Sequence, residues 1–202
     1  MSNKAIIYVH GKGGCPKEAD HLRPLFPGCE TYGIDYKNNT PWEAGKEIGE
    51  AILSLSLRSD GIILIANSIG AYFSMNAGID EYVEKAFFIS PIVDMVKLIR
   101  DMMNYARVSE NELKKRGKIR TDLGEDLSWE YYTFAKDHPV WWKAPTEVLY
   151  GSEDTITDRE TIKEFCSKHD AGLTVMEGGE HWFHTDEQMD FLINWIKKGT
   201  DK

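Results

Sequence analysis

Short apolar runs that alternate with helical patterns constrain the fold of this chain more than any other feature. Several of the runs are apolar at successive positions, which is typical of strands covered on both faces. The runs are Ala5–Val9, Thr31–Ile34, Gly61–Ala66, Lys85–Ile89, Thr146–Tyr150 and Leu173–Met176. The alternation predicts a mostly parallel six-stranded sheet with helices on both sides, a three-layer α/β/α sandwich.

Three of the intervening helices have recognisable starts. Thr40-Pro41-Trp42-Glu43 combines a capping box with proline at the first helical position. Further helices are predicted to begin at Thr157-Asp158 and at Thr185-Asp186. The apolar positions expected to face inward are Ala44, Ile48, Ala51, Ile52 and Leu55 in the first helix, Ile162, Phe165 and Cys166 in the second, and Met189, Leu192, Ile193 and Ile196 in the third.

The stretch between the fourth and fifth runs, Ser90 to Pro145, breaks this rhythm. It predicts helices at Asp94–Arg107, Ser109–Arg116 and Ser128–Lys136, with a polar turn region at Lys118–Glu125. The stretch is too structured for a linker and too small for a separate domain. We therefore expect one domain over residues 1–202, with an insertion at about residues 91–144 that lies over one edge of the sheet.

Composition excludes several classes of protein. A length of 202 residues suits one domain, and a net charge of -9 argues against a nucleic-acid partner. The three cysteines form no CxxC pair, so neither a disulfide framework nor a zinc site is expected, and we predict no metal or other cofactor. The apolar run Ala5–Val9 is too short for a secretory signal, and no run reaches the length of a membrane span. A cytoplasmic protein is expected.

Ser68 is the candidate nucleophile. It follows a predicted strand directly and opens a helix, which is the context of a nucleophile elbow. Such a turn needs small residues two positions before and after the nucleophile; Gly70 meets this need, and Ala66 stands where glycine is usual. An ordinary N-cap serine is the alternative, so the assignment depends on partner residues.

A glycine-rich segment, Gly11-Lys12-Gly13-Gly14, follows the first predicted strand. Backbone N–H groups in such a turn can stabilise the oxyanion of acyl transfer, together with the N–H of Ile69 after the nucleophile. A phosphate-binding loop is the alternative. The segment matches neither phosphate motif, because no Ser or Thr follows the lysine and Pro16 stands where the last glycine of G-x-G-x-x-G belongs.

A serine nucleophile also needs a base and a residue that orients the base. Asp154 follows the fifth predicted strand, and strand ends of this kind feed the catalytic edge of a parallel sheet. A turn aspartate is the alternative reading of Asp154. Asp94, after the fourth strand, is the rival acid, whereas Asp158 suits the first turn of a helix.

His181 is the candidate base, because it lies after the sixth predicted strand and ahead of the last helix, behind two glycines. His184 is the alternative base, three residues further on. His10 is better explained as a structural residue of the glycine-rich turn.

The order Ser68, Asp154, His181 resembles that of the α/β-hydrolase superfamily, and the resemblance covers nearly the whole chain. It implies that these three residues form a triad and that the N–H groups of Lys12 and Ile69 form the oxyanion hole. It also implies a strand order of 2-1-3-4-5-6, the loss of two N-terminal strands found in larger members, and a cap made by the insertion.

These features predict a serine hydrolase that cleaves a carboxylic ester or thioester of a small-molecule acyl substrate through an acyl-enzyme on Ser68. The alternatives are the same triad acting on an amide or in acyl transfer, and a non-catalytic binding protein with this fold. Apolar residues of the insertion could line an acyl pocket, although packing onto the sheet would explain most of them. The candidate substrate-binding residues are Met102, Trp129, Tyr132 and Trp182.

Overall fold

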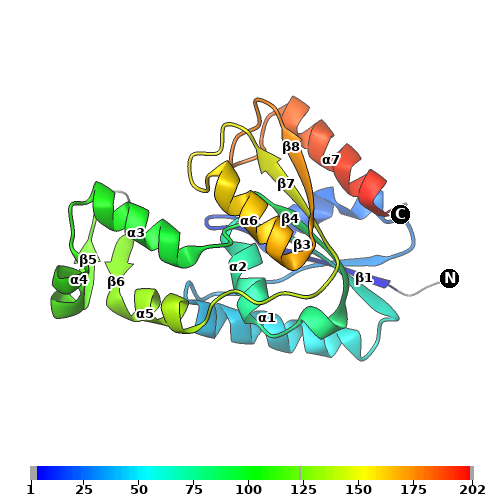
Figure 1. Ribbon diagram of the computed structural model, residues 1–202. Coiled ribbons are helices and arrows are strands. Elements are labelled where there is room, and N and C mark those ends of the chain that lie inside the picture. Colours follow the sequence, from blue (N-terminus) through cyan, green and yellow to red (C-terminus); the bar gives the residue numbers. More distant parts are fainter. Residues whose placement is uncertain (1–3, 123, 201–202) are drawn as a thin grey trace. The chain divides into compact units, whose positions relative to one another are not determined.

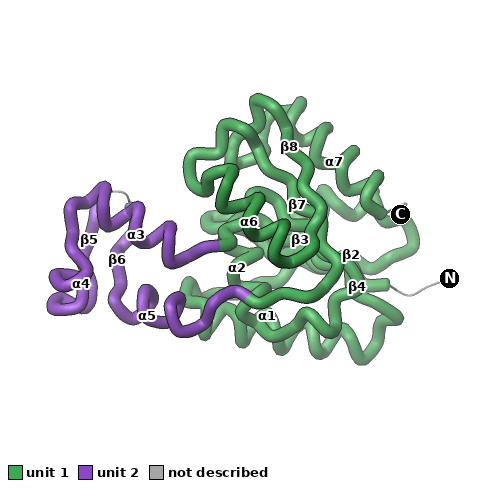
Figure 2. Tube along the Cα trace, viewed as in Figure 1, with its two compact units in different colours: residues 1–93, 141–202 green, residues 94–140 purple. Residues whose placement is uncertain are grey.

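The computed structural model describes residues 4–122 and 124–200 of the chain (Figure 1). The chain divides into two compact units, one of residues 1–93 and 141–202 and the other of residues 94–140 (Figure 2). The second unit falls inside the stretch where the sequence predicts an insertion. None of the helices in the described ranges is both long and apolar enough to cross a membrane.

A six-stranded sheet forms the centre of the first unit. Its strands are β1 (Lys4–Val9), β2 (Glu30–Gly33), β3 (Gly61–Asn67), β4 (Val83–Ile89), β7 (Thr146–Gly151) and β8 (Gly172–Met176). They lie in the order β2-β1-β3-β4-β7-β8, and every neighbouring pair is parallel. Counted among themselves, these strands have the predicted order 2-1-3-4-5-6. Five of the predicted runs lie within the strands, and the other extends one residue beyond β2.

Helices cover both faces of this sheet, as predicted (Figure 1). The helical elements of the first unit are the short 3-10 helices η1 (Pro16–His21), η2 (Arg23–Leu25) and η3 (Asp80–Tyr82) and the α-helices α1 (Pro41–Ser56), α2 (Ile69–Asn76), α6 (Arg159–His169) and α7 (Asp186–Thr200). One core cluster joins α7 and the η1 segment to the strand side chains of one face, among them Ile6, Ile65 and Phe87.

The buried face of α7 differs from the expected one. The sequence predicts that Met189 and Ile193 face inward, but both are only partly buried. Trp195 is buried instead and packs edge-on against Phe87, with 5.3 Å between the ring centroids. The inward face of α7 therefore carries the Trp195 indole, because burying this large apolar ring contributes much to stability.

The second unit is helical with one small hairpin. Its elements are α3 (Met95–Tyr105), α4 (Glu110–Arg116), β5 (Lys118–Arg120), β6 (Asp126–Ser128) and α5 (Trp129–Asp137). The three predicted helices are confirmed, and their N-caps Asp94, Ser109 and Ser128 each accept a backbone hydrogen bond. The polar turn region predicted at Lys118–Glu125 is wrong in its first half, which forms β5 and pairs antiparallel with β6.

Candidate active site

Ser68 occupies the sharp turn between β3 and α2. Its backbone has φ 53° and ψ -120°, a region that residues other than glycine rarely adopt. The Ser68 N–H donates a hydrogen bond to the Ile89 carbonyl at 2.9 Å, which ties the turn to the end of β4. Strain of this kind persists only where the surrounding structure holds it, and it gathers at functional sites.

The small residues around this serine are a steric requirement. A Cβ atom added to Gly70 would lie 2.4 Å from the carbonyl oxygen of His10 and 2.7 Å from that of Val9, so α2 packs directly on the end of β1. Ala66, the other expected small residue, is completely buried in β3. The turn therefore has the close strand–helix approach of a nucleophile elbow.

The structure brings the side chains of Ser68, His181 and Asp154 together. Ser68 Oγ lies 2.8 Å from His181 Nε2, and His181 Nδ1 lies 2.8 Å from Asp154 Oδ2. The Asp154 side chain is fully buried, while 15% of the His181 side chain is exposed. The three residues follow β3, β7 and β8, whose carboxyl ends share one edge of the parallel sheet.

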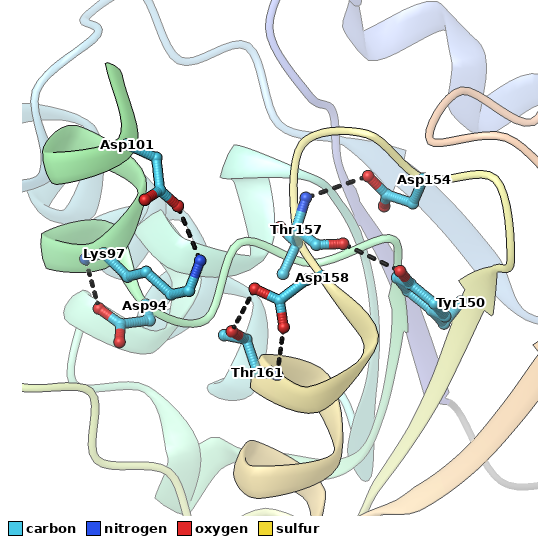
Figure 3. Close-up of polar contacts among 8 residues, drawn as sticks. All are labelled: Asp94, Lys97, Asp101, Tyr150, Asp154, Thr157, Asp158 and Thr161. Atoms are coloured by element: carbon cyan, nitrogen blue, oxygen red, sulfur yellow. Dashed lines mark hydrogen bonds and ion pairs between the residues drawn. The ribbon is translucent and has the colours of Figure 1, made fainter. Parts of the chain in front are cut away.

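The loop after β7 fixes the orientation of Asp154. Asp154 Oδ1 accepts hydrogen bonds from the N–H groups of Ile156 at 2.8 Å and Thr157 at 3.1 Å. The Tyr150 hydroxyl donates to the Thr157 carbonyl at 3.0 Å and closes the base of the loop (Figure 3). Oδ1 is thus occupied by the loop itself, and Oδ2 is the oxygen that faces the histidine.

Close backbone packing joins this loop to the one that carries His181. A Cβ atom added to Gly151 would lie 2.4 Å from the carbonyl oxygen of Gly179. The Glu153 N–H donates to the same carbonyl at 2.8 Å, and the Ser152 N–H donates to Met176 at 3.0 Å. The two loops therefore form one backbone-bonded platform for the acid and the histidine.

The glycine-rich segment after β1 forms a tight turn beside Ser68. The Gly14 N–H donates to the Gly11 carbonyl at 3.1 Å, and Gly13 has a φ of 75°, which glycine adopts at little cost. A Cβ atom on Gly11 would lie 3.2 Å from the Cβ of Ser68. Ile69 is the first residue of α2, so its N–H has no acceptor within that helix.

The rival acid and base occupy other places. Asp94 caps α3 in the second unit, where its Oδ1 accepts from the Lys97 N–H at 2.8 Å (Figure 3). His184 Nδ1 lies 2.7 Å from the Trp182 carbonyl. His10 stacks on Tyr36 with 4.3 Å between ring centroids, which fits the structural role that the sequence predicts for it.

Asp158 caps α6, and its Oδ1 accepts from the Thr161 N–H at 2.9 Å (Figure 3). The sequence places the start of this helix at Thr157. The helix begins at Arg159, because Asp158 makes the capping bond and Thr157 belongs to the loop that holds Asp154.

The four candidate substrate-binding residues have different environments. Trp182 follows His181 directly and is 68% exposed. In the second unit, Tyr132 is buried, and its hydroxyl is bonded to Arg100 Nε at 2.9 Å and to Glu110 at 3.1 Å. Met102 and Trp129, of the same unit, are half-buried. A role for these residues in an acyl pocket stays a prediction.

Sequence reasoning missed one carboxylate next to the glycine-rich turn. Glu18, in η1, accepts the Cys15 N–H through Oε1 at 3.0 Å and the Tyr8 hydroxyl through Oε2 at 2.7 Å. Burial and this hydrogen bond raise the pKa of Tyr8 well above its ordinary value. The signal was present, because Cys15-Pro16-Lys17-Glu18 has proline at the first helical position and glutamate at the third.

The described ranges contain no group of three or more His, Cys, Asp or Glu side chains placed to hold a metal ion. What these ranges do assemble is a serine, a histidine and a buried carboxylate in one hydrogen-bonded line, which is the arrangement needed to deprotonate a hydroxyl group.

No protein-family model matches the sequence, and no curated protein is significantly similar to it. Solved structures are similar in fold. Est1E from Butyrivibrio proteoclasticus has a TM-score of 0.76 at 17% identity, covering 98% of this chain and 87% of that one. The alpha/beta hydrolase domain-containing protein 10 from mouse has a TM-score of 0.72 at 18% identity, covering 98% of this chain and 89% of that one. The esterase Pf2001 from Pyrococcus furiosus has a TM-score of 0.62 at 20% identity, covering 98% of this chain and 83% of that one. The protein therefore has the α/β-hydrolase fold.

Proposed function

We propose that the protein is a serine hydrolase that cleaves a carboxylic ester or thioester through an acyl-enzyme on Ser68. The observation that carries this proposal is the hydrogen-bonded line from the buried Asp154 carboxylate through His181 to Ser68 Oγ, at 2.8 Å for each contact. A serine that served only as a helix cap would need neither partner, and Ser68 makes no side-chain capping bond to α2.

In the first half of the reaction, Ser68 Oγ attacks the acyl carbonyl carbon while His181 Nε2 takes the hydroxyl proton. The Asp154 carboxylate accepts a hydrogen bond from Nδ1–H, so it selects the tautomer whose Nε2 is free to accept a proton. It also stabilises the positive charge that the ring then carries. The tetrahedral intermediate collapses, and the leaving alcohol or thiol departs with the proton from His181.

In the second half, His181 Nε2 removes a proton from a water molecule that attacks the acyl-enzyme carbonyl. Collapse of this second intermediate breaks the bond to Ser68 Oγ, which recovers its proton from His181. The carboxylic acid is released, and the three residues return to their starting protonation states.

Backbone N–H groups would stabilise the oxyanion in both halves. Ile69 lies at the N-terminus of α2, where the helix dipole also favours negative charge. The Lys12 N–H belongs to the turn that packs against Ser68 through Gly11. Donors held in place before the reaction need no reorganisation when the charge develops.

Two features support an ester with an apolar part as the substrate. Ile156 and Trp182 are apolar side chains within two residues of the acid and the histidine, and they are 46% and 68% exposed. Est1E, which shares the fold, has also been solved with ferulic acid bound. Apolar side chains that line a binding site favour an apolar acyl or alcohol group over a charged one, and we propose that role for Ile156 and Trp182.

Labelling with a fluorophosphonate probe tests the nucleophile. We expect labelling of the wild type, its loss in Ser68→Ala, and strong reduction in His181→Ala. Ser54→Ala, at an exposed position of α1, and His184→Ala are the matched controls and should label like the wild type. Labelling that persists in Ser68→Ala would overturn the proposal.

A panel of p-nitrophenyl esters of increasing acyl length tests the substrate class. We expect kcat/KM to depend on chain length and to vanish in Ser68→Ala. Trp182→Ala should weaken the preference for the favoured chain while leaving fluorophosphonate labelling in place. Equal rates on every ester would remove the case for an apolar acyl site.

A further inference from the structure

We propose that Glu18 is a positioning residue that holds the glycine-rich turn after β1 in the geometry required to stabilise the oxyanion. This inference rests on the proposed hydrolase function of Ser68. Glu18 touches neither the nucleophile nor the histidine in the contacts described above, so it acts through the turn.

The two carboxylate oxygens of Glu18 accept hydrogen bonds from residues on both sides of the turn. Oε2 accepts the hydroxyl of Tyr8, which lies in β1 before the turn, at 2.7 Å. Oε1 accepts the backbone N–H of Cys15, which lies directly after the turn, at 3.0 Å. One side chain therefore closes the loop formed by residues 9–14, in which Lys12 supplies the proposed oxyanion N–H.

The turn needs such an anchor because it is rich in glycine. Gly11, Gly13 and Gly14 lose more conformational entropy on ordering than other residues would. Gly14 is also the residue that admits the carboxylate, since a Cβ atom there would lie 2.8 Å from Glu18 Oε1. Fixing an N–H donor ahead of the reaction is what gives an oxyanion hole its effect, and a shift of about 1 Å can cost roughly 100-fold in rate.

The chemistry of Tyr8 supports a permanent contact. Burial raises the pKa of its hydroxyl first, and the hydrogen bond to Glu18 raises it further. The hydroxyl therefore stays protonated and remains a donor to the carboxylate over the whole range in which an enzyme works. The side chain of Asn67, the residue before Ser68, lowers the pKa of the same hydroxyl and so opposes part of this shift, which places the cluster next to the nucleophile turn as well.

The neighbouring strand offers a matched control. Tyr32 donates its hydroxyl to Glu30, both in β2, and this hydrogen bond is the first cause of the raised pKa of Tyr32. The pair has the same chemistry as Tyr8 and Glu18, but Glu30 is exposed and lies outside the glycine-rich turn.

The test compares steady-state hydrolysis of a p-nitrophenyl ester by Glu18→Ala, Glu18→Gln, Tyr8→Phe and Glu30→Ala. Rates are divided by the concentration of sites that a fluorophosphonate labels to completion, so that misfolded protein does not count. We expect kcat in Glu18→Ala to fall by about 10- to 100-fold with little change in KM, because only the transition state carries the oxyanion. In Glu18→Gln and in Tyr8→Phe kcat should fall by about 3- to 10-fold, since each variant keeps one of the hydrogen bonds that hold the turn.

A trifluoromethyl ketone provides a second readout, because its adduct with Ser68 carries an oxyanion. Its affinity should fall in parallel with kcat/KM across the Glu18 and Tyr8 variants and stay unchanged in Glu30→Ala. A general loss of stability would instead lower the labelled fraction and leave normalised kcat and ketone affinity alone.

Unchanged normalised kcat in both Glu18→Gln and Tyr8→Phe would overturn the inference, even where Glu18→Ala does not fold. The inference would also be overturned if normalised kcat fell as much in Glu30→Ala as in the Glu18 variants. Failure of the proposed function gives a different result, because turnover and labelling would then be absent from the wild type or would persist in Ser68→Ala.

Discussion

His181 Nδ1 lies 2.8 Å from Oδ2 of Asp154, and this is the one oxygen of the carboxylate that its own loop leaves to the histidine. Asp154 Oδ1 is occupied by the N–H groups of Ile156 and Thr157. The loop therefore sets which way the side chain points, and a substitution at residue 154 will inherit that orientation.

Asp154→Asn should lower kcat by about 1,000- to 10,000-fold with little change in KM. The amide oxygen will take the place of Oδ1, because only an oxygen can accept the two backbone N–H groups. The amide NH2 will then face Nδ1 of His181 and force the proton onto Nε2, where it blocks proton transfer from Ser68. Ester hydrolysis at saturating substrate measures the effect.

Asp94→Asn is the control for this prediction. Asp94 caps α3 through its Oδ1, an oxygen that asparagine retains, so activity should change less than about threefold. A larger loss in Asp94→Asn than in Asp154→Asn would move the assignment of the acid.

Gly70→Ala should destabilise the protein by about 1–3 kcal/mol and lower kcat, because its Cβ would lie 2.4 Å from the His10 carbonyl. Relief requires α2 to move away from β1, which displaces Ser68. The free energy of unfolding in urea and the rate of fluorophosphonate labelling report the two effects.

Gly45→Ala in α1 is the matched control. Its Cβ would meet the Asn76 carbonyl at 3.4 Å, an ordinary contact, and alanine favours the helix by about 0.5–1 kcal/mol. We expect equal or higher stability and full activity. Equal effects of the two substitutions would show that the close approach at Gly70 does not constrain the turn.

Local patterns explain why the sheet was predictable from sequence. Several of the strands, such as β1 and β3, are apolar at successive positions, which is typical of strands covered by helices on both faces. The approach of Ser68, Asp154 and His181 follows from one further rule, that the carboxyl ends of parallel strands meet at one edge. The distances do not follow from that rule, because they depend on the loop in which Gly151 packs against Gly179.

The missed features lack periodicity. The strands β5 and β6 have three residues each, too few to show an alternating pattern. Glu18 lies in a six-residue 3-10 helix, and its partners Tyr8 and Cys15 come from both sides of the glycine-rich turn. Contacts of this kind depend on how the turn folds back on itself, and a local sequence pattern does not predict that.

Alkaline pH should destabilise the protein in part through Tyr36. Burial raises the pKa of its hydroxyl to about 12, with a smaller contribution from the Glu18 carboxylate. An unfolded tyrosine titrates near about pH 10, so between these values the folded state binds more protons than the unfolded state. The contribution to stability is therefore full below about pH 10 and is lost as the pH rises toward about 12.

Tyr36→Phe tests this sign. At neutral pH the variant should lose about 0.5–1.5 kcal/mol of stability, because phenylalanine has no hydroxyl to donate to the His10 carbonyl. Its free energy of unfolding should then fall less steeply than that of the wild type above about pH 10. Urea titrations over this range measure both slopes, with Tyr105→Phe, at a position 74% exposed, as the control. Parallel slopes for Tyr36→Phe and the wild type would contradict the prediction.

Asp170→Gly should stabilise the protein. Asp170 ends α6 with φ 51° and ψ 41°, a left-handed conformation that costs about 1–2 kcal/mol for a residue with a Cβ atom. Its exposed carboxylate also lies at the negative end of the helix dipole, which is unfavourable by about 0.3–1 kcal/mol. Glycine removes both costs, at the expense of a more flexible unfolded chain, so we expect a net gain of about 1 kcal/mol and a rise in Tm of about 2–4 °C.

Asp170→Asn separates the two contributions, because asparagine resembles aspartate in its tolerance of the left-handed conformation but has no charge. Its gain should be a few tenths of a kcal/mol from the dipole alone. Asp170→Ala should lose stability relative to glycine, since alanine pays the full cost of the positive φ. Thermal unfolding of the three variants at one protein concentration gives the order Gly, Asn, Ala. If Asp170→Ala is as stable as Asp170→Gly, backbone strain at the end of α6 contributes nothing to stability, and the dipole accounts for any gain.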